Sequence, residues 1–102
     1  MKIFLDDVRP TPAGYTCIRD VEVLKKVFIW NQDKVKEISL DHDLGENVPT
    51  GYDFLVWLEE GVAMGAFEQI PELKIHSANP VGRKNMEAAI KSIYKMLEER
   101  GE

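Results

Sequence analysis

Two short apolar runs that end abruptly in acidic residues constrain this chain more than any other feature. Residues 2–5 read KIFL and are closed by DD at 6–7, and residues 38–40 read ISL and are closed by DHD at 41–43. Short, nearly continuous apolar runs are typical of strands buried inside a parallel sheet. Charged groups placed directly after such strands need compensation, so the pattern predicts a buried sheet with an acidic site at its edge.

Two further strands and three helices are expected from the rest of the chain. Tyr15–Ile18 and residues 73–77 (LKIHS) have the composition of short strands. Asp20 is a good N-cap for a helix that breaks at 31–33, and the apolar residues of 54–62 recur at helical spacing. Asn79 followed by Pro80 predicts the start of a last helix that runs to about Glu99.

Strands that alternate with helices indicate crossover connections and therefore a mostly parallel sheet. The chain has 102 residues, enough for one hydrophobic core, and shows no linker or repeat. We therefore expect a single α/β domain over residues 1–102, with four strands in the order 2-1-3-4 and helices covering the sheet.

Composition narrows the function. The formal net charge of −5 argues against an extended nucleic-acid-binding surface, which needs clustered Lys and Arg. No apolar run approaches the roughly 20 residues of a membrane span, and no secretion signal is visible, so we expect a cytoplasmic protein. The single cysteine, Cys17, is expected to be a buried, inert thiol.

The carboxyl ends of parallel strands meet at one rim, where α/β proteins bind ligands. Several acidic groups gathered there repel one another and call for a cation, and oxygen ligands suit Mg²⁺ or Mn²⁺. The predicted ligands are Asp6, Asp7, Asp41 and Asp43. The alternative is that these aspartates only cap strand ends and solvate loops.

The segment HSANPVGR at 76–83 has the composition of an anion site at a helix start, where free N–H groups and the helix dipole favour phosphate. The predicted phosphate-binding residues are Ser77, Asn79, Gly82, Arg83 and, from the first loop, Arg9. An ordinary Asn-Pro cap with an exposed arginine is the alternative. For Arg9 the alternative is a salt bridge to one of the aspartates.

The two histidines of the chain, His42 and His76, both fall at the predicted rim. Imidazole exchanges protons near neutral pH, so either suits general acid–base catalysis, and either can equally be a structural group. His42 lies among the predicted metal ligands and is the first choice. Asp41 is the third candidate catalytic residue, as a nucleophile.

The stretches KIFLDD, ISLDHDLG with TGYDFLVWL, and KIHSAN resemble the three signature regions of response-regulator receiver domains. The resemblance implies a receiver-like (flavodoxin-like) three-layer sandwich with Mg²⁺ held at the strand ends. In it, Asp6 and Asp7 correspond to the acidic pair, Asp41 to the phosphoacceptor and Ser77 to the hydroxyl residue.

The sequence also departs from that family. VRPTPAG at 8–14 leaves little room for the usual helix between the first two strands, and the fifth strand with its Lys has no counterpart, so the fold is expected to be truncated. A closer resemblance, from DDVRP through DHDLG and TGYD to HSANPVGR, is to the divergent cyclic-phosphate processing receiver domain. That group implies processing of RNA ends.

Three functions follow. The first is divalent-metal-dependent processing of a phosphate ester, with a phosphorylated small molecule or an RNA end, most plausibly a 2′,3′-cyclic phosphate, as substrate. The second is a minimal receiver signalling module, phosphorylated at Asp41 and acting on a partner protein. The third is a non-catalytic domain that binds a metal or a protein.

Overall fold

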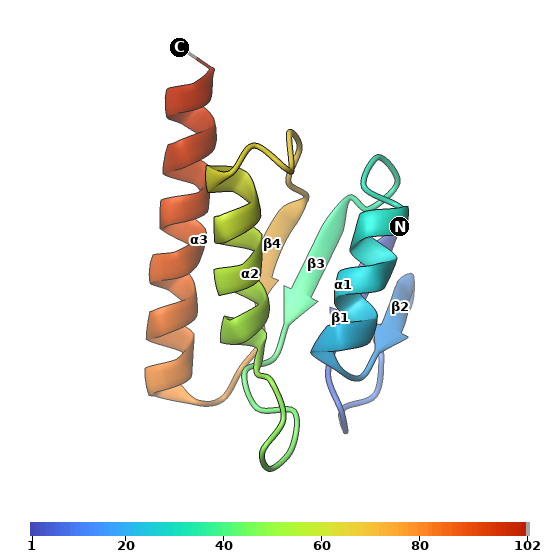
Figure 1. Ribbon diagram of the computed structural model, residues 1–102. Coiled ribbons are helices and arrows are strands. Elements are labelled where there is room, and N and C mark those ends of the chain that lie inside the picture. Colours follow the sequence, from blue (N-terminus) through green and yellow to red (C-terminus); the bar gives the residue numbers. More distant parts are fainter. Residues whose placement is uncertain (102) are drawn as a thin grey trace.

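The computed structural model describes residues 1–101 and has a four-stranded parallel sheet (Figure 1). The strands are β1 (Lys2–Leu5), β2 (Tyr15–Ile18), β3 (Glu37–Leu40) and β4 (Glu72–Ile75). Their spatial order is β2-β1-β3-β4, all neighbours are parallel, and the α/β class and the strand order predicted from the sequence are confirmed. The last strand ends earlier than predicted, so His76 and Ser77 lie just beyond it.

Three helices connect and follow these strands: α1 (Val21–Trp30), α2 (Gly51–Ala63) and α3 (Pro80–Arg100). The side chain of Asp20 accepts a hydrogen bond from the backbone N–H of Val23, which fixes the start of α1. Thr50 and Asp53 form a reciprocal capping box at the start of α2. No helix of the described residues combines the length and the apolar composition needed to cross a membrane.

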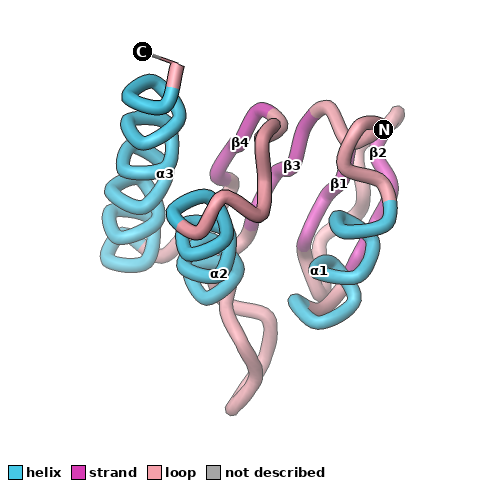
Figure 2. The backbone as a smooth tube through the Cα atoms, turned by 45° about the horizontal axis from the view of Figure 1, so that its top comes forward, coloured by secondary structure: helices cyan, strands magenta, loops and turns pink. Residues whose placement is uncertain are grey.

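All three helices lie over the same face of the sheet, so the described residues form two layers (Figures 1 and 2). A single apolar cluster joins them to alternate strand residues such as Ile3, Leu5, Ile38 and Leu40, whereas the buried Phe4 is not a member. This differs from the expected three-layer sandwich. The physical reason is the short connection 8–14, which puts no helix between β1 and β2, the one crossover that would place a helix on the other face.

The other face of the sheet, which we call the open face, carries polar and aromatic side chains in place of a second helical layer. Its strand residues are Lys2, Phe4, Tyr15, Cys17, Glu37, Ser39, Glu72 and Lys74. The Tyr15 hydroxyl donates to the Glu37 carboxylate, and Lys74 Nζ lies 3.2 Å from Glu37 Oε1. Cys17 is half-buried on this face and not fully buried as expected.

Candidate metal centre and active site

The candidate site lies at the carboxyl ends of three adjacent strands, β1, β3 and β4. Asp6, Asp41 and His76 each follow a strand and continue its ladder, since their backbone N–H groups donate to Ile18, Leu5 and Leu40 of the neighbouring strands. They therefore form the next row after Phe4, Ser39 and Lys74, on the side of the open face. Parallel register alone brings two carboxylates and one imidazole together.

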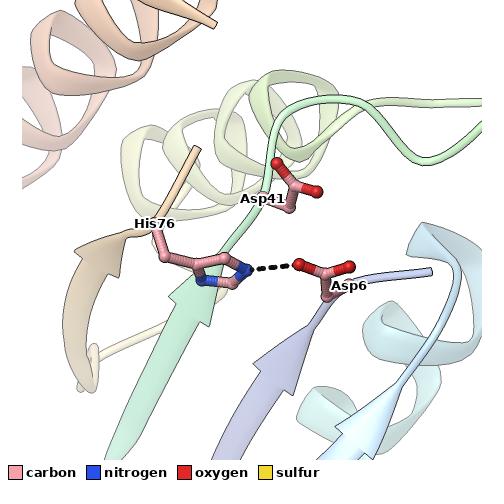
Figure 3. Close-up of side chains that lie close together, drawn as sticks. All are labelled: Asp6, Asp41 and His76. Atoms are coloured by element: carbon pink, nitrogen blue, oxygen red, sulfur yellow. Dashed lines mark hydrogen bonds and ion pairs between the residues drawn. The ribbon is translucent and has the colours of Figure 1, made fainter. Parts of the chain in front are cut away.

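These three side chains converge closely enough to share one ion (Figure 3). One ligand atom from each of Asp6, Asp41 and His76 lies within 4.8 Å of the others. His76 Nε2 is 3.0 Å from Asp6 Oδ2. Two carboxylates and a neutral imidazole are ordinary ligands of divalent metals, so the donor set fits a metal ion.

Asp6 is fully buried and is fixed by the loop that follows it. Its Oδ1 accepts hydrogen bonds from the backbone N–H groups of Val8 and Arg9, both at 2.9 Å, which leaves Oδ2 to face the other site residues. Burial by itself raises the pKa of Asp6, but those two backbone donors and His76 outweigh it and hold the pKa below its usual value. These contacts favour the charged form of Asp6.

Asp41 is less well compensated. It is 8% exposed, and one oxygen accepts a hydrogen bond from the backbone N–H of His42, at 2.8 Å. Its other oxygen has no hydrogen-bond donor among the described residues. Burial and the nearby charge of Asp6 raise the pKa of Asp41, with burial the larger cause. A nearly buried carboxylate with a free oxygen beside a second carboxylate suits a cation.

Arg9 supplies positive charge at the mouth of the site. Its guanidinium donates to the backbone carbonyl of His76, and its Nε lies 3.8 Å from Asp6 Oδ2. The salt bridge weighed from the sequence is thus present, and it also holds the arginine at the rim. The side chain is 40% exposed, so it remains reachable for an anion.

His76 is held on both ring nitrogens and on one ring face. Its Nδ1 is 2.7 Å from the hydroxyl of Ser39, while Nε2 faces Asp6. The Phe4 ring stacks against the imidazole, with 4.1 Å between centroids and 7° between planes. The described contacts therefore join His76 to Asp6, Ser39 and Phe4, and they give the imidazole one fixed orientation.

His42 follows Asp41 directly, so its side chain lies on the opposite side of the sheet, the side that the helices cover. Its Nδ1 is 2.9 Å from Asp43 Oδ1, and Asn79 donates to the other oxygen of Asp43 at 3.2 Å. These two hydrogen bonds, from His42 first, hold the pKa of Asp43 below its usual value. Asp43 is exposed and points to His42, so it orients the imidazole and leaves Nε2 of His42 free.

Gly82 leaves the space into which the imidazole of His42 packs. A Cβ at Gly82 would lie 2.5 Å from two ring carbons of His42. The glycine in the first turn of α3 therefore lets the imidazole pack against that helix. Asn79 caps α3 by accepting from the N–H of Gly82 at 3.0 Å, as predicted from the Asn-Pro pair.

The remaining predicted residues lie further from the three-residue cluster. Ser77 is buried and its hydroxyl accepts from the backbone N–H of Asn79. Arg83 is directed along α3, where its Nε lies 3.2 Å from Glu87 Oε1 and it donates to the Ile75 carbonyl. Asp7 is half-buried, and its backbone carbonyl accepts from Arg19. Of the two predicted arginines, Arg9 is the one beside the aspartates.

Sequence reasoning missed three residues that shape the site. Ser39 and Phe4 contact His76 from the open face. The alternation of side chains along a strand could have predicted that Phe4, Ser39 and His76 share one side of the sheet. Gly51 is the first residue of α2, and a Cβ there would lie 1.9 Å from the carbonyl oxygen of Asp41. No local sequence signal reports that approach of α2 to the end of β3.

The comparison with known families agrees with this geometry. The model of the cyclic-phosphate processing receiver domain matches residues 1–92. The chain belongs to this family. For a receiver domain, the carboxyl rim that carries Asp6 and Asp41 is the expected place of the site, and the resemblance inferred from the sequence is confirmed. No curated protein and no solved structure matches the chain.

Proposed function

We propose that this receiver domain uses a divalent metal, Mg²⁺ or Mn²⁺, to open a cyclic phosphate, namely a 2′,3′-cyclic phosphate at the end of an RNA. The single observation that carries the proposal is the convergence of Asp6, Asp41 and His76 within 4.8 Å at the carboxyl rim. The matching family is described by cyclic-phosphate processing, and this supports the choice of substrate.

The reaction is a hydrolysis. A water oxygen forms a bond to phosphorus, one of the two ring P–O bonds breaks, and the sugar oxygen that leaves takes up a proton, giving a terminal phosphate monoester. A bound divalent ion supplies a Lewis acid for a phosphoryl oxygen and lowers the pKa of a bound water. Asp6 and Asp41 are the residues that would hold that ion.

His42 is suited to move the proton. The 2.9 Å contact between Asp43 and its Nδ1 orients the imidazole and leaves Nε2 free to accept or donate, a common arrangement for a general acid–base group. Asp43 and Asn79 then act through His42 as positioning residues. This supports the prediction that His42, of the two histidines, carries the proton.

Positive charge for the phosphoryl oxygens is available from Arg9, at the mouth of the site. The net charge is −5, and the positive charge near the site is confined to one place. A small or terminal phosphate is therefore a better substrate than a long stretch of RNA. The proposed substrate is accordingly a nucleotide or an RNA end.

The test is incubation of an oligonucleotide that ends in a 2′,3′-cyclic phosphate with the protein and Mg²⁺ or Mn²⁺, followed by mass spectrometry for the gain of one water. We expect turnover that EDTA abolishes and that Asp41→Asn lowers at least about 100-fold, since metal activation contributes several kcal/mol. Asp33→Asn, which changes an exposed aspartate far from the rim, is the matched control.

The second candidate is a signalling module phosphorylated on Asp41, and the oxygen of Asp41 without a donor favours it. A small phosphodonor with Mg²⁺ would then leave a phosphoryl adduct on Asp41. An adduct together with no turnover of cyclic-phosphate ends would replace the enzyme by the switch. The third candidate, a non-catalytic domain, would bind the ion and show neither reaction.

A further inference from the structure

We infer that His76 is a metal ligand through Nε2, that Ser39 is the positioning residue which turns that nitrogen toward the ion, and that the centre therefore prefers a first-row transition ion to Mg²⁺. The inference rests on the metal centre of the proposed function and deepens it. All-oxygen sites suit Mg²⁺, whereas an imidazole ligand raises the affinity for later divalent metals of similar size.

The separation of the two nearest ligand atoms supports this assignment. Atoms bound to one ion at about 2.1 Å each and at right angles lie about 3.0 Å apart. His76 Nε2 and Asp6 Oδ2 are 3.0 Å apart and share a hydrogen bond in the metal-free protein, so an ion that replaces the shared proton needs little movement of either side chain. Asp41, with one oxygen that no donor occupies, lies within 4.8 Å of both and provides the next ligand.

The position of protons on His76 explains why Ser39 matters. If Nδ1 carries the proton and donates to Ser39 Oγ, then Nε2 presents a lone pair to Asp6 Oδ2, and two acceptors face one another with nothing between them. A cation between them resolves that conflict. Without the ion, the Ser39 hydroxyl can rotate and donate to Nδ1 while Nε2–H donates to Asp6, so the same serine serves both states.

The imidazole is also fixed against rotation. The Phe4 ring covers one face at 4.1 Å, and both Phe4 and Ser39 are only 7% exposed. Arg9 binds the backbone carbonyl of His76. Metal-bound histidines usually donate their second nitrogen to a fixed acceptor, and loss of that acceptor commonly lowers metal affinity about 10- to 100-fold.

The experiment is calorimetric titration of the metal-free protein with Co²⁺ and with Mg²⁺, which have the same charge and similar size. The measured quantity is the ratio of the two dissociation constants, and the visible spectrum of bound Co²⁺ reports its ligands. We expect Co²⁺ to bind more tightly than Mg²⁺ in the native protein. His76→Gln should remove most of the preference and shift the Co²⁺ spectrum.

Ser39→Ala should weaken Co²⁺ binding on the order of 10-fold and leave Mg²⁺ binding nearly unchanged. Ser39→Thr keeps the hydroxyl and should restore the preference, which a purely structural role for the serine would not produce. The matched controls are His42→Gln and Ser92→Ala, which change the other histidine and a half-buried serine of α3. Neither should move the ratio.

The outcomes separate the two ideas. If the native protein binds both ions equally, or if His76→Gln and Ser39→Ala leave the ratio unchanged, the inference is overturned while a metal-dependent reaction survives. If no divalent ion binds at all, both the inference and the proposed function fail. If the preference is present but no cyclic phosphate is opened, the inference stands and only the proposed activity fails.

Discussion

The two faces of this sheet are built from alternate residues of the same four strands, yet they are stabilised in different ways. The helix-covered face packs Ile3, Ile38 and Leu40 into one apolar cluster with all three helices. The open face has no helical layer among the described residues and uses contacts such as those of Glu37 with Tyr15 and Lys74. The sheet is thus stable without a second helical layer because polar contacts stabilise its open face.

The candidate site belongs to the open face, and this is the functional consequence of the difference. Asp6, Asp41 and His76 continue the alternation of the open face beyond the strand ends. Ser39 and Phe4 support His76 from within that face.

The comparison predicts a large difference in stability between the two faces. Ile38→Ala removes a fully buried side chain and should lower the free energy of unfolding by about 2–5 kcal/mol. Lys74→Ala, on the open face and half exposed, should cost much less. Urea unfolding of both variants measures this, and equal losses would mean that the open face is not a solvent-facing surface.

Tight packing on the helix side should extend to the rim itself. Gly51→Ala would place a Cβ 1.9 Å from the Asp41 carbonyl oxygen and 3.0 Å from the Met86 side chain, so the start of α2 must shift. We expect a loss of about 1–3 kcal/mol, measured by urea unfolding, together with weaker metal binding. Gly101→Ala is the control, since its Cβ would meet its nearest neighbour at 3.4 Å. Equal behaviour of the two variants would contradict the close approach.

At the rim, by contrast, Asp41 should lower the stability of the metal-free protein while it provides a ligand for the ion. Burial and the charge of Asp6 raise the pKa of Asp41, so the ionised carboxylate destabilises the metal-free fold at neutral pH. Asp41→Asn keeps the acceptor for the His42 N–H and should stabilise the protein in EDTA by about 1 kcal/mol, the size of one such repulsion in water. The same variant should lose the stabilisation that a divalent ion gives the native protein.

Thermal unfolding with and without the ion tests both statements. The gain in EDTA should shrink as the pH falls through the raised pKa of Asp41, and it should be gone below about pH 3.8, where the carboxyl group is neutral in the folded and the unfolded chain alike. A variant that is less stable than the native protein in EDTA would show that Asp41 is held by favourable contacts and not by a missing cation.

The sequence predicted the fold class, the strand order and the rim because these depend on local patterns: apolar runs, caps and parallel register. Three layers were expected from the sequence, although the short connection 8–14 together with right-handed crossovers puts all three helices on one face. That Asp6 and Asp41 meet followed from strand ends alone. His76 joins them because its side chain lies on the open face of the sheet. The predicted strand over 73–77 did not make that side clear.

Other parts of the site depend on contacts that no local pattern reports. Arg83 was predicted as a phosphate clamp, but Glu87, one turn later on α3, binds its guanidinium. Gly82 was predicted as a point of approach for a ligand, and the His42 ring occupies that space. Both cases show that a residue suited to a ligand is often used by a neighbour in the same chain.

The smallest predicted effect concerns the pH dependence of the open face. The Tyr15 hydroxyl first, and then Lys74, hold the pKa of Glu37 below its usual value of 4.5. An acid whose pKa is lower in the folded protein stabilises the fold above the pKa of the unfolded chain, and that stability is lost as the pH falls through the folded value. Glu37→Gln should therefore lower the melting temperature near pH 7 and have progressively less effect below about pH 4.5.

Melting curves of the native protein and of Glu37→Gln, recorded from pH 7 down to pH 3 in EDTA, provide the measurement. Because Asp6 also has a lowered pKa and is present in both proteins, only the difference between the two curves reports Glu37. Tyr15→Phe removes the principal hydrogen bond and should shrink that difference, whereas an exposed pair such as Glu22 and Lys25 on α1 offers a control in Glu22→Gln. A difference that stays constant down to pH 3 would mean that Glu37 packs as a neutral side chain, and the polar account of the open face would then be wrong.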